Sequence, residues 1–180
     1  MSGIDTKADF VPVNIAVLTV SDTRKSDDDR SGDTLAKRIS DAGHNVVYRK
    51  IVPDDRDTIS AQLRTWCGDG VVDVVISTGG TGLTGRDVTV EAHRDVYEKE
   101  IEAFGTVFTI VSMKKIGTSA VQSRATGGVA MGTYLFALPG SPGACKDAWD
   151  EILQFQLDIR HRPCNFVEIF PRLDEHLRRK

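Results

Sequence analysis

Val71-Val-Asp-Val-Val-Ile76 is an apolar run that leads directly into the densest glycine cluster of the chain, Ser77-Thr-Gly-Gly-Thr-Gly-Leu-Thr-Gly85. An apolar run rich in β-branched residues predicts a strand that is covered on both faces of its sheet. Glycines that follow a strand let the backbone turn sharply and approach a ligand, because no Cβ stands in the way. The stretch therefore predicts a buried strand that ends in a candidate ligand-binding loop.

Similar apolar runs occur on both sides of this strand, and segments with helical spacing separate them. Further strands are expected at 14–20, 44–52 and 133–138, and helices at 35–42, 57–67, 89–98, 101–115 and 141–162. Asp57 is expected to cap the second helix, and Ser141 with Pro142 the last. The polar segment 21–33 is expected to be a loop, and the glycine-rich segment 117–132 fits neither pattern. Strands that alternate with helices predict an α/β fold, a three-layer sandwich with a mainly parallel sheet.

Polar residues and glycines follow each of the four predicted strands. These positions are Ser21 and Asp22, Pro53 and Asp54, the stretch 79–87, and Pro139 to Ser141. In a parallel sheet the carboxyl ends of the strands lie at one edge, and ligands of open α/β sheets bind in the crevice outside it. We therefore expect these four segments to lie together and to form the binding site.

The composition is that of a globular chain with a mildly acidic balance. Of the 180 residues 40% are hydrophobic, and 23 Lys and Arg stand against 26 Asp and Glu, a net charge of −3. A general nucleic-acid binder needs a surplus of cations on one face, and the basic cluster at 178–180 is expected to be a solvated tail. We expect no nucleic-acid partner. One domain is expected over 13–166, between an N-terminal tail, 1–12, and a C-terminal tail, 167–180.

The chain shows no feature of a membrane or secreted protein. No apolar stretch approaches the roughly 20 residues that span a bilayer, and the first ten residues, MSGIDTKADF, do not resemble a signal peptide. The three cysteines, Cys67, Cys145 and Cys164, include no CxxC pair. We therefore expect a cytoplasmic protein with reduced thiols and no membrane partner.

The glycine loop allows more than one interpretation. Gly80, Gly82 and Gly85 satisfy the spacing G-x-G-x-x-G, but no acid follows at the tip of a next strand, which argues against a dinucleotide-binding fold. The loop also lacks the lysine of a P-loop. Two interpretations remain open. The stretch is a tight turn in which Asp87 caps the next helix, or it is a backbone cradle for an anion or a flat ring.

Two aspartates at the predicted edge are candidate metal ligands. Taken singly, Asp54 and Asp87 are typical turn formers and caps. Together, beside an anion cradle, they form a candidate pair of Mg²⁺ ligands, because Mg²⁺ in phosphate chemistry is held by one or two carboxylates and substrate oxygens. The four histidines show no metal-ligand spacing. The acidic run Asp27-Asp28-Asp29 is expected in a solvated, mobile loop or a lid.

The stretch 77–89, with TGGTG followed by RDVT, closely resembles the molybdenum cofactor biosynthesis proteins of the MoaB/MogA family. Further matches lie at 15–22, 51–54, 117–119 and 138–141, so that the resemblance covers about 13–166. The run Gln122-Ser-Arg124 and the ending Arg162-Pro-Cys-Asn-Phe166 resemble the MoaB branch specifically.

The resemblance implies an α/β molybdopterin-binding domain that assembles into homotrimers, or homohexamers in the MoaB branch, with other enzymes of the molybdenum cofactor pathway as further partners. It also implies Mg²⁺- and ATP-dependent adenylylation of molybdopterin, in which the pterin phosphate attacks the α-phosphorus of ATP and pyrophosphate leaves. Some members of the MoaB branch lose acids at the positions of Asp54 and Asp87, and this chain keeps both. The alternative is a non-catalytic molybdopterin-binding or scaffold protein.

By the same resemblance, Asp54 and Asp87 are the catalytic residues and would orient Mg²⁺ and the triphosphate. The residues expected to bind the substrates are Ser21, Asp22, Thr78, Gly79, Gly80, Thr81, Gly82, Arg86, Ser112, Ser123, Arg124, Pro139, Gly140 and Ser141. Arg86 and Arg124 are expected to stabilise phosphate charge. Val90 departs from the family pattern, in which proline is usual, and a modest effect is expected.

Overall fold

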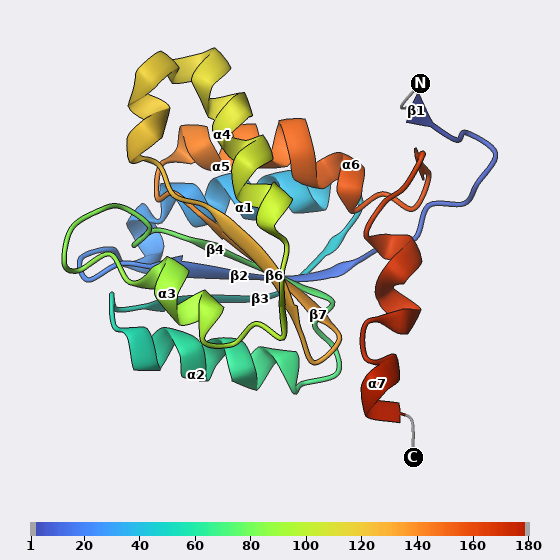
Figure 1. Cartoon of the computed structure of the whole chain (residues 1–180), viewed down its shortest axis with the longest axis horizontal. Helices are drawn as coiled ribbons and strands as arrows, with labels where there is room; N and C mark the ends of the chain where they lie inside the picture. The colour runs from blue at the N-terminus through green and yellow to red at the C-terminus, as the bar shows by residue number, and fades with distance from the viewer. Residues whose placement is uncertain (1–2, 179–180) are drawn as a thin grey trace.

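The computed structural model of the chain describes residues 3–178 and has a six-stranded sheet at its centre (Figure 1). The strands, in spatial order, are β3 (Asn45–Val52), β2 (Asn14–Val20), β4 (Val74–Thr78), β7 (Thr133–Leu138), β6 (Thr126–Ala130) and β5 (Lys99–Glu100). The first four are parallel, β6 is antiparallel to β7, and β5 is antiparallel to β6. The predicted α/β fold with a mainly parallel sheet is confirmed.

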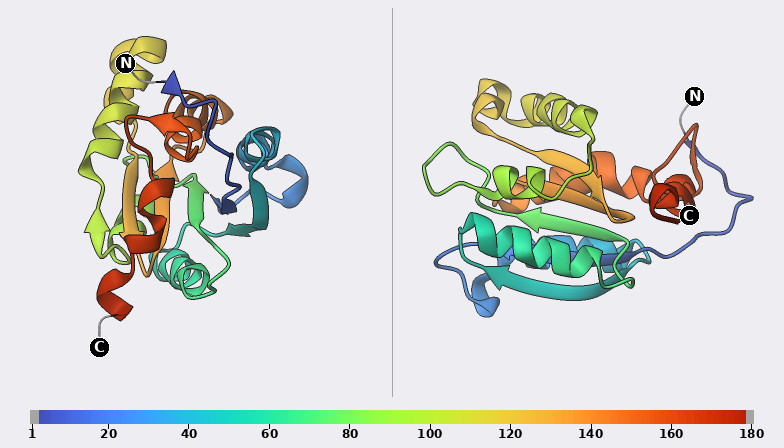
Figure 2. Two further views of the ribbon diagram at one scale, coloured as in Figure 1. Left: turned by 90° about the vertical axis from the view of Figure 1, so that its right-hand side faces the viewer. Right: turned by 60° about the horizontal axis from the view of Figure 1, so that its bottom comes forward.

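Helices cover both faces of the sheet and complete the three expected layers (Figures 1 and 2). On one face lie α1 (Arg30–Asp41), α4 (Glu102–Ile116) and α5 (Pro142–Ala148), and on the other lie α2 (Arg56–Cys67) and α3 (Thr89–Arg94). Side chains of a strand alternate between its faces. In β2, Ile15 and Val17 therefore pack in the first core, whereas Ala16 and Leu18 pack in the second.

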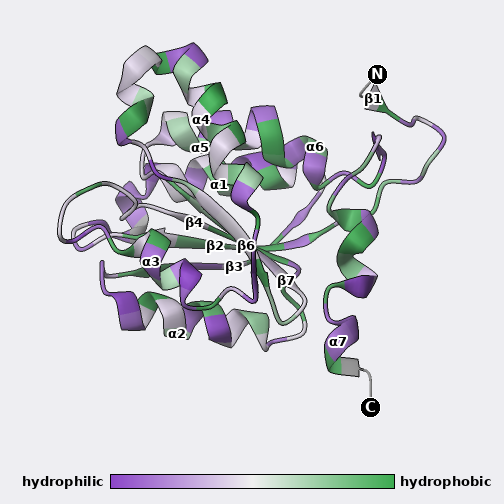
Figure 3. Cartoon of the chain, viewed as in Figure 1, coloured by the Kyte–Doolittle hydropathy of each residue, from purple (hydrophilic) through white to green (hydrophobic). Residues whose placement is uncertain are grey.

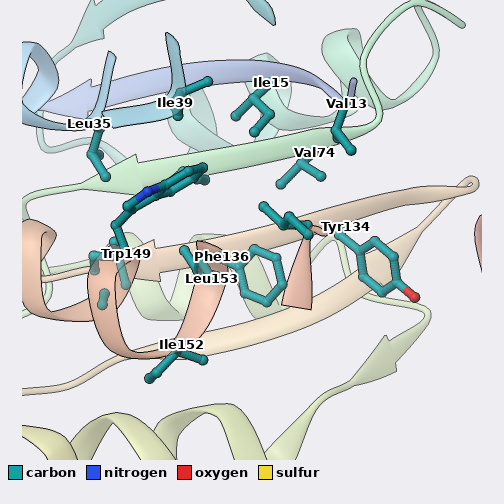
Figure 4. Packing of buried hydrophobic residues seen from close by; sticks show 14 of the residues in the cluster. Val13, Ile15, Leu35, Ile39, Val74, Tyr134, Phe136, Trp149, Ile152 and Leu153 are labelled. Carbon is teal, nitrogen blue, oxygen red and sulfur yellow. The ribbon is translucent and has the colours of Figure 1, made fainter. Parts of the chain in front are cut away.

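The first core is built around the indole of Trp149. This residue begins a π-helical turn, η3 (Trp149–Leu153), that continues α5, and α6 (Gln154–Gln156) ends the helical segment. Figure 4 shows Trp149 beside Leu35 of α1 and close to Phe136 of the sheet. The second core is covered by α2, along which hydrophobic and hydrophilic residues alternate (Figure 3). Both faces of the central strands are thus sealed, and only their ends reach solvent.

Several element boundaries differ from the predicted ones. The first helix begins at Arg30 and not at residue 35, β4 begins at Val74 and not at residue 71, and the last long helical segment ends at Gln156 and not at residue 162. The cap of α2 is Asp55, whose carboxylate accepts hydrogen bonds from the backbone and the hydroxyl of Thr58, so the prediction of Asp57 as the cap is wrong. β4 continues through residues 77–78, because both pair with β7. The helix expected at 89–98 ends at Arg94, because the chain then turns to form β5.

The segment 21–33 is more ordered than expected. It contains a short 3-10 helix, η1 (Ser26–Asp28), and the first residues of α1. Asp29 is buried, and its carboxylate accepts a hydrogen bond from the Thr19 hydroxyl at 2.7 Å and one from the Gly32 backbone at 3.0 Å. The expectation of a wholly solvated acidic loop is wrong at this residue, because Asp29 is the N-cap of α1.

The glycine-rich segment 117–132 folds as the 3-10 helix η2 (Gly117–Gln122), strand β6 and the turn to β7. Near the termini, β1 (Gly3–Ile4) pairs with β8 (His161–Arg162), and η4 (Val167–Arg172) and α7 (Glu175–Arg178) follow. Most of the basic cluster at the end of the chain lies outside the described residues. Among residues 3–178, no helix combines the length and the apolar character that crossing a membrane requires.

Candidate functional site

The four predicted segments lie together at the carboxyl edge of the parallel strands. The backbone N–H of Asp22 donates to the carboxylate of Asp54, which joins the segments after β2 and β3. The N–H of Gly79 donates to the carbonyl of Leu138 at 3.1 Å, which joins residues 79–87, here called the glycine loop, to the end of β7. Figure 1 shows this loop projecting beyond the end of the sheet. The topology therefore gathers the glycines and acids as predicted.

Two glycines let the loop backbone pack against the neighbouring segments. Gly79 and Gly80 have φ angles of +102° and +61°, which residues with a Cβ rarely adopt. A Cβ on Gly79 would lie 2.2 Å from the carbonyl oxygen of Val20 at the end of β2. A Cβ on Gly80 would lie 2.5 Å from Oδ1 of Asp54. The loop can therefore lie directly on the strand end and on the aspartate only because these positions carry no side chain.

The carboxylate of Asp87 folds back onto the glycine loop. It accepts hydrogen bonds from the backbone N–H of Thr84 at 2.8 Å and from the Thr84 hydroxyl at 2.6 Å. The Thr84 hydroxyl is the main group that lowers the pKa of Asp87, so this carboxylate is ionised at neutral pH. The residue before α3 is Val88, with no side-chain cap, so the interpretation of Asp87 as a helix cap is wrong.

Asp54 has the opposite environment. Partial burial raises its pKa above the ordinary value, and the negative charge of Asp22 raises it further. A cation placed beside this carboxylate would offset both effects. The side chains available are oxygen donors, the ligand type that Mg²⁺ prefers. Within residues 3–178 no three His, Cys, Asp or Glu side chains gather as a metal site. The residues fit Mg²⁺, provided that substrate or water oxygens complete its coordination.

Arg86 links the glycine loop to the segment after β2. Its guanidinium donates to Oδ2 of Asp22 from Nη2 at 2.5 Å and from Nε at 3.1 Å. This ion pair lowers the pKa of Asp22. The Arg86 side chain is 67% exposed, and exposed ion pairs are weak because water screens them. Arg86 could therefore exchange Asp22 for a phosphate group with little loss of stability.

Arg124 holds the glycine loop rather than facing it as a free cation. Its Nε donates to the carbonyls of Thr81 at 2.9 Å and Gly82 at 3.0 Å, and Nη2 donates to the carbonyl of Asp87 at 3.2 Å. Both Nη atoms also bind the carboxylate of Glu91 in α3. The planar guanidinium thus fixes three loop carbonyls at once, a task that suits arginine and not lysine.

The end of β7 is held by a second set of hydrogen bonds. The carbonyl of Gly140 accepts from Arg24 and from the Ser31 hydroxyl, each at 2.9 Å. The Thr78 hydroxyl donates to the carbonyl of Pro139 at 3.0 Å. Ser141 caps α5, as predicted, by accepting from the backbone of Ala144. The hydroxyls of Thr78 and Ser141 therefore shape this edge, and Thr78 is itself buried.

Three serines expected at the site have different surroundings. Ser21 lies at the edge, where its hydroxyl accepts from the backbone of Thr23 and Arg24. Ser123 precedes Arg124 and lines a separate cavity of about 480 Å³ with residues of α3, β5 and α4. Ser112 is buried in α4, and no recorded hydrogen bond in the described part of the chain joins it to the glycine loop. The structure therefore brings Ser21 to the aspartates but not Ser112.

Thr89 is a residue that the sequence analysis did not single out. It is fully buried at the start of α3, and its backbone N–H donates to the carbonyl of Gly80 at 2.9 Å, which closes the glycine loop on itself. Glu91, the partner of Arg124, was missed as well. The signal available was position: Thr89 is the last residue of the RDVT run, and Glu91 follows two residues later on the same helix.

Comparison with known families decides the classification. Residues 16–159 match the model of the family described as "Probable molybdopterin binding domain". The chain belongs to this family. The match begins in β2 and ends after α6, so the molybdopterin-binding domain includes all four segments of the edge described above.

Relatives agree with this family assignment. Molybdenum cofactor biosynthesis protein B of Escherichia coli (strain K12) is 48% identical over 166 residues, which are 92% of this chain and 96% of the relative. A crystal structure of a molybdenum cofactor biosynthesis protein B has a TM-score of 0.83 at 36% identity and covers 92% of this chain and 98% of that one. A MogA structure has a TM-score of 0.70 at 27% identity, over 80% and 97%. The expected MoaB/MogA family, its fold and its place in molybdenum cofactor biosynthesis are confirmed.

Proposed function

We propose that this molybdopterin-binding protein transfers an adenylyl group from ATP to the phosphate of molybdopterin, with Mg²⁺ as cofactor. The observation that carries the proposal is the pair Asp54 and Asp87, which lie against the backbone of the glycine loop. Two carboxylates beside a bound phosphate repel it, so a site that only binds a phosphorylated pterin is better without them. They favour binding when a cation lies between them and the phosphates.

The proposed reaction forms one P–O bond and breaks another. An oxygen of the pterin's terminal phosphate attacks the α-phosphorus of ATP. The bond from that phosphorus to the oxygen bridging it to the β-phosphate breaks, and pyrophosphate leaves with the electron pair. No protein group forms a covalent bond, so catalysis depends on alignment and on neutralisation of charge. A bound Mg²⁺ would neutralise part of the triphosphate charge.

The residues of this chain would supply the alignment. The backbone of Gly79 to Gly82 would bind the pterin phosphate, in the shape that Arg124 imposes through the loop carbonyls. Asp54, which lies against Gly80, and Asp87, which lies against Gly82, would together orient the metal and the triphosphate. Arg86 would leave Asp22 and bind a triphosphate oxygen, since its present ion pair is exposed and weak. Thr78 and Ser141 would act through the backbone that they hold.

We also propose that the protein assembles as a homotrimer or homohexamer. Four apolar side chains of α4 are between 42% and 53% exposed, namely Val107, Ile110, Met113 and Ile116. A row of exposed apolar residues on one helix is typical of a surface that another chain covers. Light scattering tests this proposal, and a mass of one chain would contradict it. Other enzymes of the cofactor pathway are further candidate partners. We propose a cytoplasmic location as well, because the proposed reaction consumes Mg-ATP.

The reaction is tested by incubating the purified protein with molybdopterin and Mg-ATP and following adenylylated pterin and pyrophosphate. Asp54→Asn and Asp87→Asn should each lower the rate by on the order of 10² or more, because each removes a charge that orients the metal. Asp41→Asn is the control, since Asp41 pairs with Lys37 on the exposed side of α1. It should leave the rate unchanged.

Two results would contradict this proposal in different ways. Normal turnover by Asp87→Asn would contradict the role of this carboxylate in the reaction. A wild-type protein that binds molybdopterin without forming product, and whose affinity is unaffected by Asp54→Asn, would be the non-catalytic binder instead.

A further inference from the structure

The hydroxyl of Thr89 is an unusual group in this fold. The residue has no exposed surface, and Oγ1 is a buried side-chain oxygen with no hydrogen-bond partner. Buried hydroxyls are normally paired, because a group that leaves water without a new partner destabilises the fold. The unpaired oxygen is therefore a position where the protein tolerates a penalty that some ligand could remove.

The surroundings of this oxygen are defined by Gly80. The position that a Cβ on Gly80 would take lies 2.4 Å from Thr89 Oγ1 and 2.5 Å from Asp54 Oδ1. Both oxygens therefore lie against the same side of the Gly80 backbone, closer than a residue with a Cβ would allow. Among the described residues no hydrogen bond is recorded between them. A neutral hydroxyl oxygen and a carboxylate oxygen thus flank one point of the glycine loop.

Two structural explanations of the hydroxyl fail. Thr89 is the first residue of α3, but the hydroxyl makes no cap. The backbone N–H of Thr89, and not its side chain, closes the loop onto Gly80. Packing alone would be served as well by valine, which has the same shape and no polar atom to bury. Neither helix capping nor packing explains why an oxygen is present here.

We propose that Thr89 Oγ1 is a neutral oxygen ligand that binds, together with Asp54, the divalent cation of the proposed reaction. The inference rests on the proposed function for the presence of that cation. Hydroxyl and carboxylate oxygens are suitable ligands of a hard cation, and a mixed set lowers the charge repulsion that two or three carboxylates create. Cation binding would also give the buried hydroxyl the partner that it lacks.

The test measures cation binding directly, with Mn²⁺ as the probe and electron paramagnetic resonance as the readout, with and without ATP. Thr89→Val should weaken Mn²⁺ binding by about tenfold or more, the usual effect of removing a group that supports a metal. Thr89→Ser keeps the oxygen and should bind almost as well as wild type. Thr65→Val is the control, because Thr65 is exposed on α2 and only donates to the carbonyl of Ala61.

Thermal unfolding without metal separates this role from a structural one. Removal of an unpaired buried hydroxyl by Thr89→Val should leave the melting temperature unchanged or raise it. A capping or other hydrogen-bonding role of the hydroxyl within the folded chain predicts a lower one. If Thr89→Val does not fold, Thr89→Ser and Thr89→Ala form a second pair that differ by one oxygen alone.

The outcomes distinguish this inference from the proposed function. Wild-type Mn²⁺ affinity in folded Thr89→Val, or equal losses in Thr89→Ser and Thr89→Ala, would overturn the role of the hydroxyl even in an active enzyme. A loss of Mn²⁺ affinity in Thr89→Val that Thr89→Ser restores would support the role even if the wild-type protein formed no adenylylated product.

Discussion

Asp22 and Asp54 exchange hydrogen bonds: the backbone N–H of each donates to the carboxylate of the other, both at 3.1 Å. This reciprocal pair fastens the segment after β2 to the segment after β3, although 32 residues separate them in the chain. The position of the Asp54 carboxylate therefore depends on a neighbour that carries the same charge. Arg86 offsets part of the repulsion between the two carboxylates, because its guanidinium pairs with Asp22.

Two substitutions of Asp22 should separate its role as the acceptor for the N–H of Asp54 from its role as a negative charge paired with Arg86. Asp22→Asn keeps an oxygen for the N–H of Asp54 and should retain most of the proposed activity. Asp22→Ala leaves that N–H without its partner and lets the segment shift. In Asp22→Ala we expect the rate of adenylyl transfer to fall by on the order of 10-fold to 10², because a small displacement of the Asp54 carboxylate would misalign the reacting groups. Steady-state kinetics checks the order, and equal rates for the two variants would contradict it.

Arg124→Lys should destabilise the protein although it keeps the charge. Lysine cannot reproduce the fork that reaches the carbonyls of Thr81, Gly82 and Asp87. We expect a loss of about 2 kcal/mol in the free energy of unfolding, the order of a lost hydrogen bond to a charged group. Chemical denaturation measures it. Arg64→Lys is the control, because Arg64 makes a single hydrogen bond to a carbonyl on the exposed side of α2. The prediction fails if both variants lose the same amount.

Alanine in place of Gly80 should affect function beyond its effect on the backbone. Gly70 has a similar φ, +75°, and an added Cβ there would meet nothing within 4 Å, so Gly70→Ala isolates the strain of the left-handed backbone. That strain is about 1 kcal/mol. Gly80→Ala should cost more stability, since its Cβ would strike Asp54 and Thr89, and it should also lower Mg²⁺-dependent activity. Equal losses of stability and unchanged activity would exclude the close contact. Thermal melts and the adenylylation assay check both parts.

Stability should fall in acid because of His93. This histidine is fully buried between the Ser77 hydroxyl and the Tyr97 hydroxyl, and burial lowers its pKa from 6.5 to about 3. In the unfolded chain His93 therefore takes up a proton near pH 6.5, whereas in the folded protein it stays neutral down to about pH 3. The free energy of unfolding is therefore unaffected by His93 above about pH 6.5. It falls by about 1.4 kcal/mol per pH unit as the pH drops from there toward 3.

Urea denaturation between pH 7 and pH 4.5 measures this dependence. His93→Gln should give a shallower slope than wild type, with a remainder from His44, whose pKa is also lowered by burial. An unchanged slope in His93→Gln would assign the acid sensitivity to other groups.

The sequence predicted the sheet because its strands have a strong local signal. Val74 to Ile76 and Leu135 to Leu138 are apolar on both faces, and only a covered parallel sheet explains this pattern. The same topology rule predicted that Asp54 and the glycine loop would lie at one edge. Short elements were harder. β5 has two residues and is held only by pairing with β6, so no local pattern could reveal it.

Side-chain roles at the edge depend on hydrogen-bond partners that residue type does not encode. Asp87 has the sequence context of a helix cap, yet the Thr84 hydroxyl and backbone bind its carboxylate. Arg124 was expected to face phosphate, and instead binds loop carbonyls 37 to 43 residues away in the chain. Asp29 looked solvated within a triple acidic run, but the Thr19 hydroxyl of β2 meets it in the interior. In each case the role of the side chain depends on which partner it binds in the folded chain.

The reversal of β6 determines which residues can reach the glycine loop. A five-residue strand spans about 17 Å, so with β6 parallel to β7 the residue at its entrance would lie on the opposite rim of the sheet. Because β6 is antiparallel, Arg124 enters at the rim where the loop begins, two residues after η2 ends. η2 in turn continues directly from the exposed helix α4. A second chain that binds to α4 and displaces it would therefore also displace η2 and Arg124. Because Arg124 binds the loop carbonyls, the shape of the glycine loop would change with it.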